Sequence, residues 1–188
     1  MMKYIKDSLA LSALVKSKMA TDDPNQLETL KEQLKDRFGV PVGVHMTGIP
    51  LAVSTLLAIF CYAMLQVSLW LLLFRWLGLP EFKVMMGVFI AAIVYCLVVM
   101  STMFLTTRGS LPGYKLHIFV ITLTGIMSII YFIWTGISLL FGPVENYTPQ
   151  ITSLLGLGCF FLNIMWMNSS IFYRSIALTL HNRVWRKQ

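Results

Sequence analysis

The sequence predicts an all-α integral membrane protein, with four transmembrane helices in an antiparallel bundle and two short cytoplasmic helices at the N-terminus. A helix needs about 20 apolar residues to cross a bilayer. Four apolar segments reach that length without one charged residue: 49–74, 84–105, 118–141 and 151–172. The composition agrees, because 57% of the 188 residues are hydrophobic and only 12% are charged, against about 25% charged in a typical soluble domain.

The first element is a cytoplasmic helical module over residues 1–38. Residues 3–20 form a helix with a broad apolar face, which lies on the inner membrane surface or docks under the bundle. The second helix, residues 24–38, has one apolar stripe: Leu27, Leu30, Leu34 and Phe38. A helix this short is not stable alone. The stripe must therefore pack within the chain or serve self-association or partner binding, and the sequence leaves these open.

A connector over residues 39–48 follows, with three glycines and one proline, and such a composition predicts a flexible or extended segment. The four-span domain covers residues 49–174, and a basic cytoplasmic tail covers residues 175–188. Lysine and arginine gather before the first span, after the second span and in the tail, whereas the loop at 142–150 has none. By the positive-inside rule, both termini are expected in the cytoplasm.

The four spans contain no ionisable acidic or basic side chain. Proton relays and ion paths usually depend on such groups, so pumping and coupled transport are disfavoured. Three amides and one glycine are the candidates for helix packing or, alternatively, for a pore lining: Gln66, Asn163, Asn168 and Gly156. An interhelical hydrogen bond contributes about 0.6–2 kcal/mol in a membrane, and packing is the favoured role.

No catalytic motif is present, since the chain lacks a phosphate-binding loop, an HExxH helix and a GxSxG turn. His45, His117 and His181 have no metal-ligand spacing and are expected to be ordinary interfacial histidines. The sequence thus predicts no enzyme, no metal and no cofactor. The net charge of +7 lies at helix ends, where membrane topology needs it, so nucleic-acid binding is not expected.

These features favour a non-catalytic, oligomeric membrane subunit that anchors or regulates a cytoplasmic partner protein. A channel or pore-forming protein and an exclusion or immunity protein remain open as alternatives. In size and layout the chain resembles the small four-span subunits of bacterial two-component modules, including the membrane subunits of phage-defence systems such as Kiwa. The resemblance is one of topology, has no motif behind it, and assigns no residue. It implies a homo-oligomer in the bacterial inner membrane and a role as a membrane sensor in antiviral defence.

Overall fold

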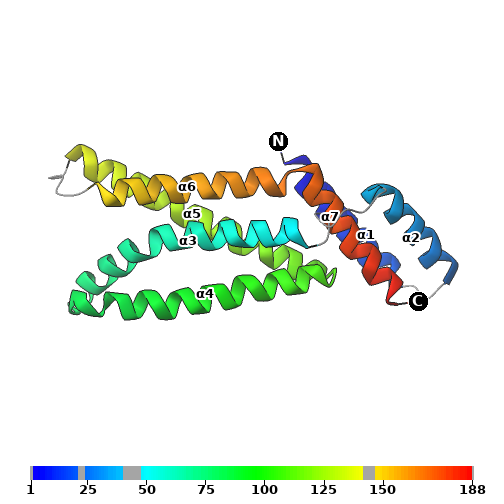
Figure 1. Cartoon of the computed structure of the whole chain (residues 1–188), viewed down its shortest axis with the longest axis horizontal. Coiled ribbons are helices and arrows are strands. Elements are labelled where there is room, and N and C mark those ends of the chain that lie inside the picture. Colours follow the sequence, from blue (N-terminus) through cyan, green and yellow to red (C-terminus); the bar gives the residue numbers. More distant parts are fainter. Residues whose placement is uncertain (1, 21–23, 40–47, 142–146, 188) are drawn as a thin grey trace. The chain divides into compact units, whose positions relative to one another are not determined.

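The computed structural model describes residues 2–20, 24–39, 48–141 and 147–187. Within these ranges the chain is all-helical and has no strand, so the all-α prediction is confirmed (Figure 1). The helices are α1 (Lys3–Lys18), α2 (Pro24–Phe38), α3 (Ile49–Trp76), the 3-10 helix η2 (Glu81–Lys83), α4 (Val84–Thr107), α5 (Leu111–Phe141), α6 (Thr148–Met167) and α7 (Ser170–Trp185).

Four of the described helices, α3 to α6, are long and apolar enough to cross a membrane. They also expose large apolar side chains, including Phe89 (67% exposed), Ile130 (61%), Leu140 (76%) and Met165 (70%). Monomeric soluble proteins rarely expose apolar patches of this extent. The fold is therefore consistent with a membrane protein.

Two predicted boundaries differ from the structure by five residues or more, and the others by at most three. The third span was expected to begin at residue 118, but α5 begins at Leu111. The Ser110 side chain accepts a hydrogen bond from the Gly113 backbone N–H (3.4 Å), and Pro112 suits a first helical turn. The fourth span was expected to reach residue 172, but α6 ends at Met167.

The largest difference is α7, which the sequence analysis did not predict and which replaces the expected tail at 175–188. Ser169 has extended backbone geometry, and its side chain accepts a hydrogen bond from the Phe172 backbone N–H (3.2 Å). Ser169 is therefore the N-cap of a new helix. Residues 40–47 of the predicted connector, including His45, lie outside the described residues.

The chain forms two compact units, which we describe separately. The terminal unit comprises Met1–Thr55, Met100–Ile118 and Ile164–Gln188, and the central unit comprises Leu56–Val99 and Phe119–Asn163. Both ends of the chain thus belong to the same unit. The units divide the chain differently from the predicted sequence domains, because each long helix except α6 contributes many residues to both.

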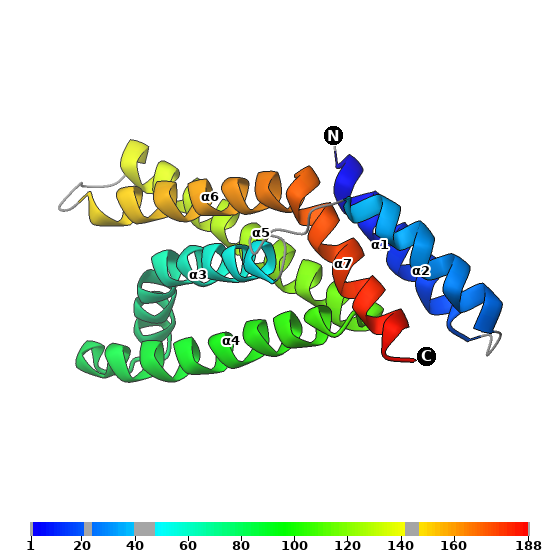
Figure 2. The same cartoon turned by 45° about the vertical axis from the view of Figure 1, so that its right-hand side comes forward.

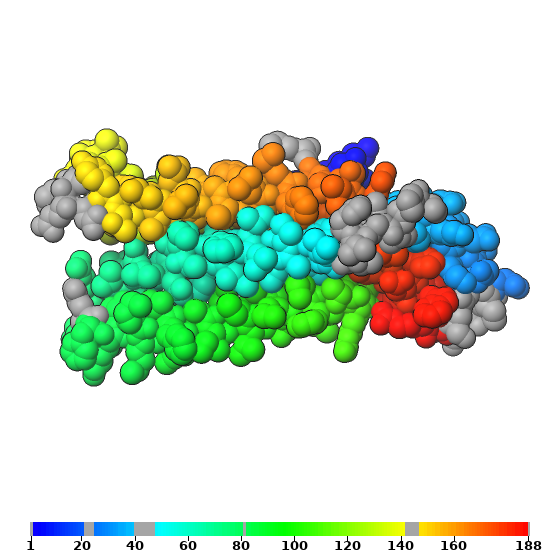
Figure 3. Space-filling view, viewed as in Figure 1, coloured from blue at the N-terminus to red at the C-terminus, as the bar shows by residue number. Residues whose placement is uncertain are grey.

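In the terminal unit, α7 runs beside α1 and α2 (Figures 1 and 2). The space-filling view shows the surface of α7, in red, against α2, in blue (Figure 3). One face of α7 is buried at every fourth residue: Phe172, Ile176, Leu180 and Val184 are each at most 2% exposed. This spacing matches one side of a helix. The buried face of α7 is the core around which the two N-terminal helices pack.

The turn between α4 and α5 also belongs to the terminal unit. Gly109 has a φ of 72°, a conformation that favours glycine. Arg183 of α7 donates a hydrogen bond to the Gly109 carbonyl (2.6 Å), and a Cβ at Gly109 would lie 3.0 Å from the Arg183 Cβ. Backbone geometry and close approach therefore both favour glycine here.

The central unit is held together by hydroxyl groups and close helix contacts. Tyr131 of α5 bridges α3 and α6, because its hydroxyl lies 2.6 Å from Ser68 Oγ and 3.2 Å from Thr152 Oγ1. Thr135 of α5 donates to Ser153 of α6 (2.8 Å). Such bonds join helices without placing a charge among apolar side chains.

Candidate functional site

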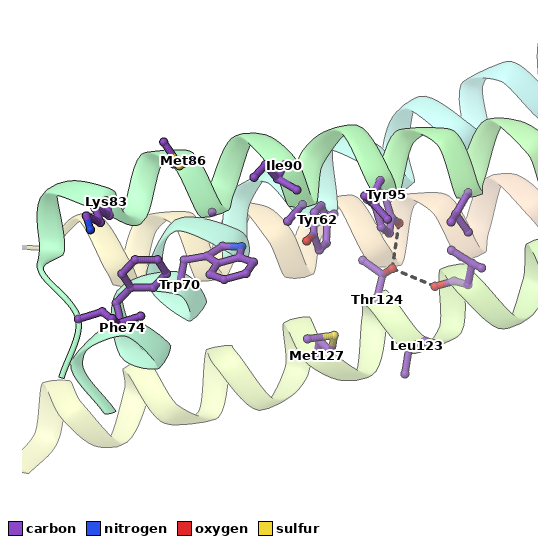
Figure 4. A pocket seen from close by; sticks show the side chains of 16 residues that line it. Tyr62, Trp70, Phe74, Lys83, Met86, Ile90, Tyr95, Leu123, Thr124 and Met127 are labelled. Carbon is purple, nitrogen blue, oxygen red and sulfur yellow. Dashed lines mark hydrogen bonds between the residues drawn. The ribbon is translucent and has the colours of Figure 1, made fainter. Parts of the chain in front are cut away.

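A cavity of about 690 Å³ lies among α3, α4 and α5 of the central unit (Figure 4). Its volume falls within the range of about 300–1,000 Å³ that is usual for ligand pockets. The cavity is open rather than enclosed, and its walls are almost entirely apolar. We take it as the candidate functional site, and hereafter call it the main cavity.

A stacked aromatic pair lies near one end of the main cavity. The rings of Tyr62 and Tyr95 are stacked, with centroids 4.1 Å apart and planes within 10° of parallel. The Tyr95 hydroxyl lies 2.9 Å from Thr124 Oγ1, which in turn donates to the Val120 carbonyl (2.9 Å; Figure 4). The Tyr95 and Thr124 hydroxyls are thus engaged with the helices. Tyr62 lies near the middle of α3.

The opposite end has a positive charge. Lys83, immediately before α4, lines the cavity together with Phe74 and Leu79. Its Nζ atom lies 5.9 Å from the centre of the Phe82 ring, which is within the range of a cation–π contact. The last lining residue on α4 is Val98, fifteen residues after Lys83, so the main cavity extends over about 22 Å of the chain there.

Trp70 forms part of the wall because Gly87 has no side chain. A Cβ at Gly87 would lie 2.8 Å from the Trp70 ring, closer than ordinary packing allows. The Trp70 ring also meets Phe74 edge-on, with centroids 5.9 Å apart. Figure 4 shows both rings between α4 and the lower helix, α5. Because Gly87 has no side chain, the Trp70 ring can lie against α4 and form this part of the cavity wall.

A second cavity of about 440 Å³ adjoins the first and contains one of the predicted amides. The two cavities share Tyr62, Trp70 and Met127 in their linings. Gln66 lines the second cavity, is 8% exposed, and has a buried Oε1 atom with no hydrogen-bond partner. A buried acceptor without a partner destabilises the fold by about 1–3 kcal/mol.

Gln66→Leu is expected to stabilise the protein by about 1 kcal/mol, because it removes this unpaired acceptor at nearly constant size. The thermal midpoint in detergent, followed by tryptophan fluorescence, measures the change. Val67→Leu, at an exposed position of the same helix, is the control and should leave the midpoint unchanged. A lower midpoint for Gln66→Leu would show that the amide has a stabilising partner.

The predicted stripe for partner binding or self-association lies inside the terminal unit. Leu27, Leu30, Leu34 and Phe38 are 6%, 1%, 1% and 5% exposed, and α2 packs against α7. The Phe38 ring also meets His181 edge-on, with centroids 5.2 Å apart. The structure therefore favours intramolecular packing for the stripe, and a partner could reach it only after α2 separates from α7.

The other predicted residues lie at buried or hydrogen-bonded positions. Asn168 Oδ1 accepts a hydrogen bond from the Tyr4 backbone N–H (3.1 Å), at the start of α1, where the N-cap Met2 provides no side-chain cap. Asn163 is 1% exposed and so does not reach a surface that could line a pore. A Cβ at Gly156 would lie 3.3 Å from Ser128 Oγ, which shows that α6 approaches α5 closely there.

His117, which was expected from the sequence to be an ordinary interfacial histidine, has two hydroxyl neighbours. It is fully buried in the terminal unit. Its Nδ1 atom lies 2.9 Å from Thr102 Oγ1, and its Nε2 atom lies 3.4 Å from Ser54 Oγ. The ring thus joins α5 to α4 and α3. The described residues contain no group of three or more metal-ligating side chains.

The main cavity was not predicted from the sequence. None of Tyr62, Trp70, Lys83 and Tyr95 was singled out as a site residue. Two tyrosines near the middle of neighbouring apolar spans were the available signal, because a buried hydroxyl needs a partner.

A comparison with protein-family models, with curated proteins and with solved structures found no match.

Proposed function

We propose that this protein is a non-catalytic, multi-pass membrane subunit whose cytoplasmic helices anchor or regulate an acidic protein partner. One observation supports this function most directly: helices from both ends of the chain, α1, α2 and α7, form one unit with a buried apolar core. Because these helices pack on one another, the polar side chains on their outer faces form one surface of defined geometry.

The charge of that surface supports an acidic partner. Basic residues outnumber acidic residues on the three helices: Lys3, Lys6, Lys16, Lys18, Lys31, Lys35, Arg37, Arg174 and Arg183 against Asp7, Glu28, Glu32 and Asp36. Lys31 pairs with Glu28 of its own helix (3.2 Å). A surface with an excess of one charge attracts a partner of the opposite charge and speeds the encounter.

Membrane insertion is part of the proposal. Its support is the length and apolar surface of α3 to α6, together with the position of the basic residues. A reporter enzyme that works only in the cytoplasm is expected to be active when it is fused after Gln188. A reporter that works only outside the membrane is expected to be inactive there. External activity would contradict the proposed orientation and the cytoplasmic partner.

Charge reversal at two exposed lysines, Lys6→Glu with Lys35→Glu, is expected to reduce partner recovery about tenfold. The partner is first identified by cross-linking in native membranes and purification of the full chain in mild detergent. The charge-preserving pair Lys6→Arg with Lys35→Arg is the control and should recover the partner fully. Recovery of the wild-type chain alone, or equal recovery with the reversed pair, would contradict the proposal.

A pore along the fourth span is less well supported. Asn163 is buried, and Asn168 is bonded to the backbone of α1. The two amides of the fourth span that were proposed as a lining are therefore engaged in packing. We propose no enzyme activity.

A further inference from the structure

We propose that the main cavity binds one acyl chain of an anionic phospholipid, with the lipid phosphate near Lys83. The site lies within the central unit and does not depend on the partner protein proposed above.

The main cavity is long enough for one lipid chain. Its lining runs along α4 from Lys83 to Val98, a rise of about 22 Å. The hydrocarbon core of a bilayer is about 30 Å thick, so a chain from one leaflet reaches about 15 Å. The stacked Tyr62 and Tyr95 rings line the cavity near that depth. A chain that enters beside Lys83 would therefore reach these rings.

The cross-section argues against a protein helix as the occupant. A volume of 690 Å³ spread over that length gives a mean cross-section of about 30 Å². A helix with side chains, about 10 Å in diameter, needs more than twice as much. An extended hydrocarbon chain is thinner than a helix and fits without moving α3 or α5. A second copy of this protein would have to widen the cavity first.

The charge at the rim selects the headgroup. Lys83 lines the end of the cavity that corresponds to the membrane surface, whereas the rest of the lining is almost entirely apolar. From Arg75 to Lys83 the sequence holds two basic residues and one acidic residue, Glu81. An ammonium group at the interface attracts an anionic headgroup. The combination of a cationic rim and a chain-sized apolar interior is the chemistry of an anionic phospholipid site.

The test uses the full-length protein in nanodiscs that contain equal amounts of phosphatidylglycerol and phosphatidylcholine. After release from the nanodiscs, native mass spectrometry counts the lipids that stay bound. The wild-type protein is expected to retain phosphatidylglycerol in preference to phosphatidylcholine. Ala91→Trp should reduce retention about tenfold, because Ala91 lines the cavity and the indole fills it. Ile93→Trp, at a half-exposed position of α4 outside the lining, is the matched control and should retain lipid normally.

The role of the charge is tested separately. Lys83→Glu should remove the preference for phosphatidylglycerol, a change of about fivefold, whereas Lys83→Arg should keep it. If Ala91→Trp does not fold, Val94→Phe fills the same space from the same helix.

Three results would overturn the proposal. The first is that the wild-type protein and a folded cavity-filling variant retain the same number of lipids. The second is that the wild-type protein retains phosphatidylglycerol and phosphatidylcholine equally. The third is a dimer cross-linked through the lining of the cavity with no lipid bound, which would assign the space to a second copy of the chain. None of these results depends on whether a cytoplasmic partner exists.

Discussion

Leu34→Asp is expected to separate α2 from α7 and to destabilise the terminal unit by at least about 3 kcal/mol. Leu34 is 1% exposed, so the variant loses the packing of a buried leucine and places a carboxylate among apolar side chains. The exchange of backbone amide hydrogens measures the effect directly. Protection should be lost throughout Pro24–Phe38 and be retained in α5.

The loss should extend along the whole of α2, because that helix depends on its neighbour. It has 15 residues, a length at which an isolated helix is marginal in water. Gln33→Asp is the matched control, since it introduces the same charge at the adjacent, exposed position. That variant should keep the wild-type protection. Unchanged protection in Leu34→Asp would mean that the contact between α2 and α7 contributes little to holding α2 in place.

The same contact shows what the sequence could predict. The stripe on α2 was visible from its spacing, and so was the requirement that it pack against something. Its neighbour was not identified, because α7 lies more than 130 residues away in the chain and was assigned to the end of a span and a tail. Two local signals were available: the N-cap Ser169, and the spacing of Phe172, Ile176, Leu180 and Val184. Both were hidden because the apolar segment appeared to continue through residue 172.

The main cavity could not be predicted for a different reason. Periodicity separates a buried face from a solvated face only when the two differ in polarity. Along α4 nearly every side chain is apolar, so Ile90, which lines the cavity, and Phe89, which is 67% exposed, look alike in sequence. Which side chain faces a cavity is decided by how the helices pack. Lys83 was recognisable as an interfacial charge, but its place at the rim needed the positions of α3 and α5.

Gly125→Ala is expected to destabilise the central unit by about 2 kcal/mol, through overpacking against Phe160. A Cβ at Gly125 would lie 2.0 Å from the nearest atom of the Phe160 ring and within 2.4 Å of two more. Three ring atoms at such distances cannot be relieved by a small side-chain rotation, so the ring or α6 must move. The thermal midpoint in detergent should fall.

The control for this variant lies on the same helix. Gly136 has nothing within 4 Å of the place where a Cβ would be added. Gly136→Ala should therefore leave the midpoint unchanged or raise it, since alanine favours a helix over glycine by up to about 1 kcal/mol. The difference between the two variants isolates the contact with Phe160 from the general effect of removing a glycine.

A second substitution tests the contact itself. Phe160→Leu alone should be destabilising, because it removes part of an aromatic ring from the helix contact. Combined with Gly125→Ala, it makes room for the added methyl group, so the two losses should not add. A double variant that is as unstable as the sum of the single variants would show that Gly125 and Phe160 act independently. A double variant that is more stable than that sum by about 1 kcal/mol or more would show that Gly125 is coupled to the Phe160 ring, which packs against it.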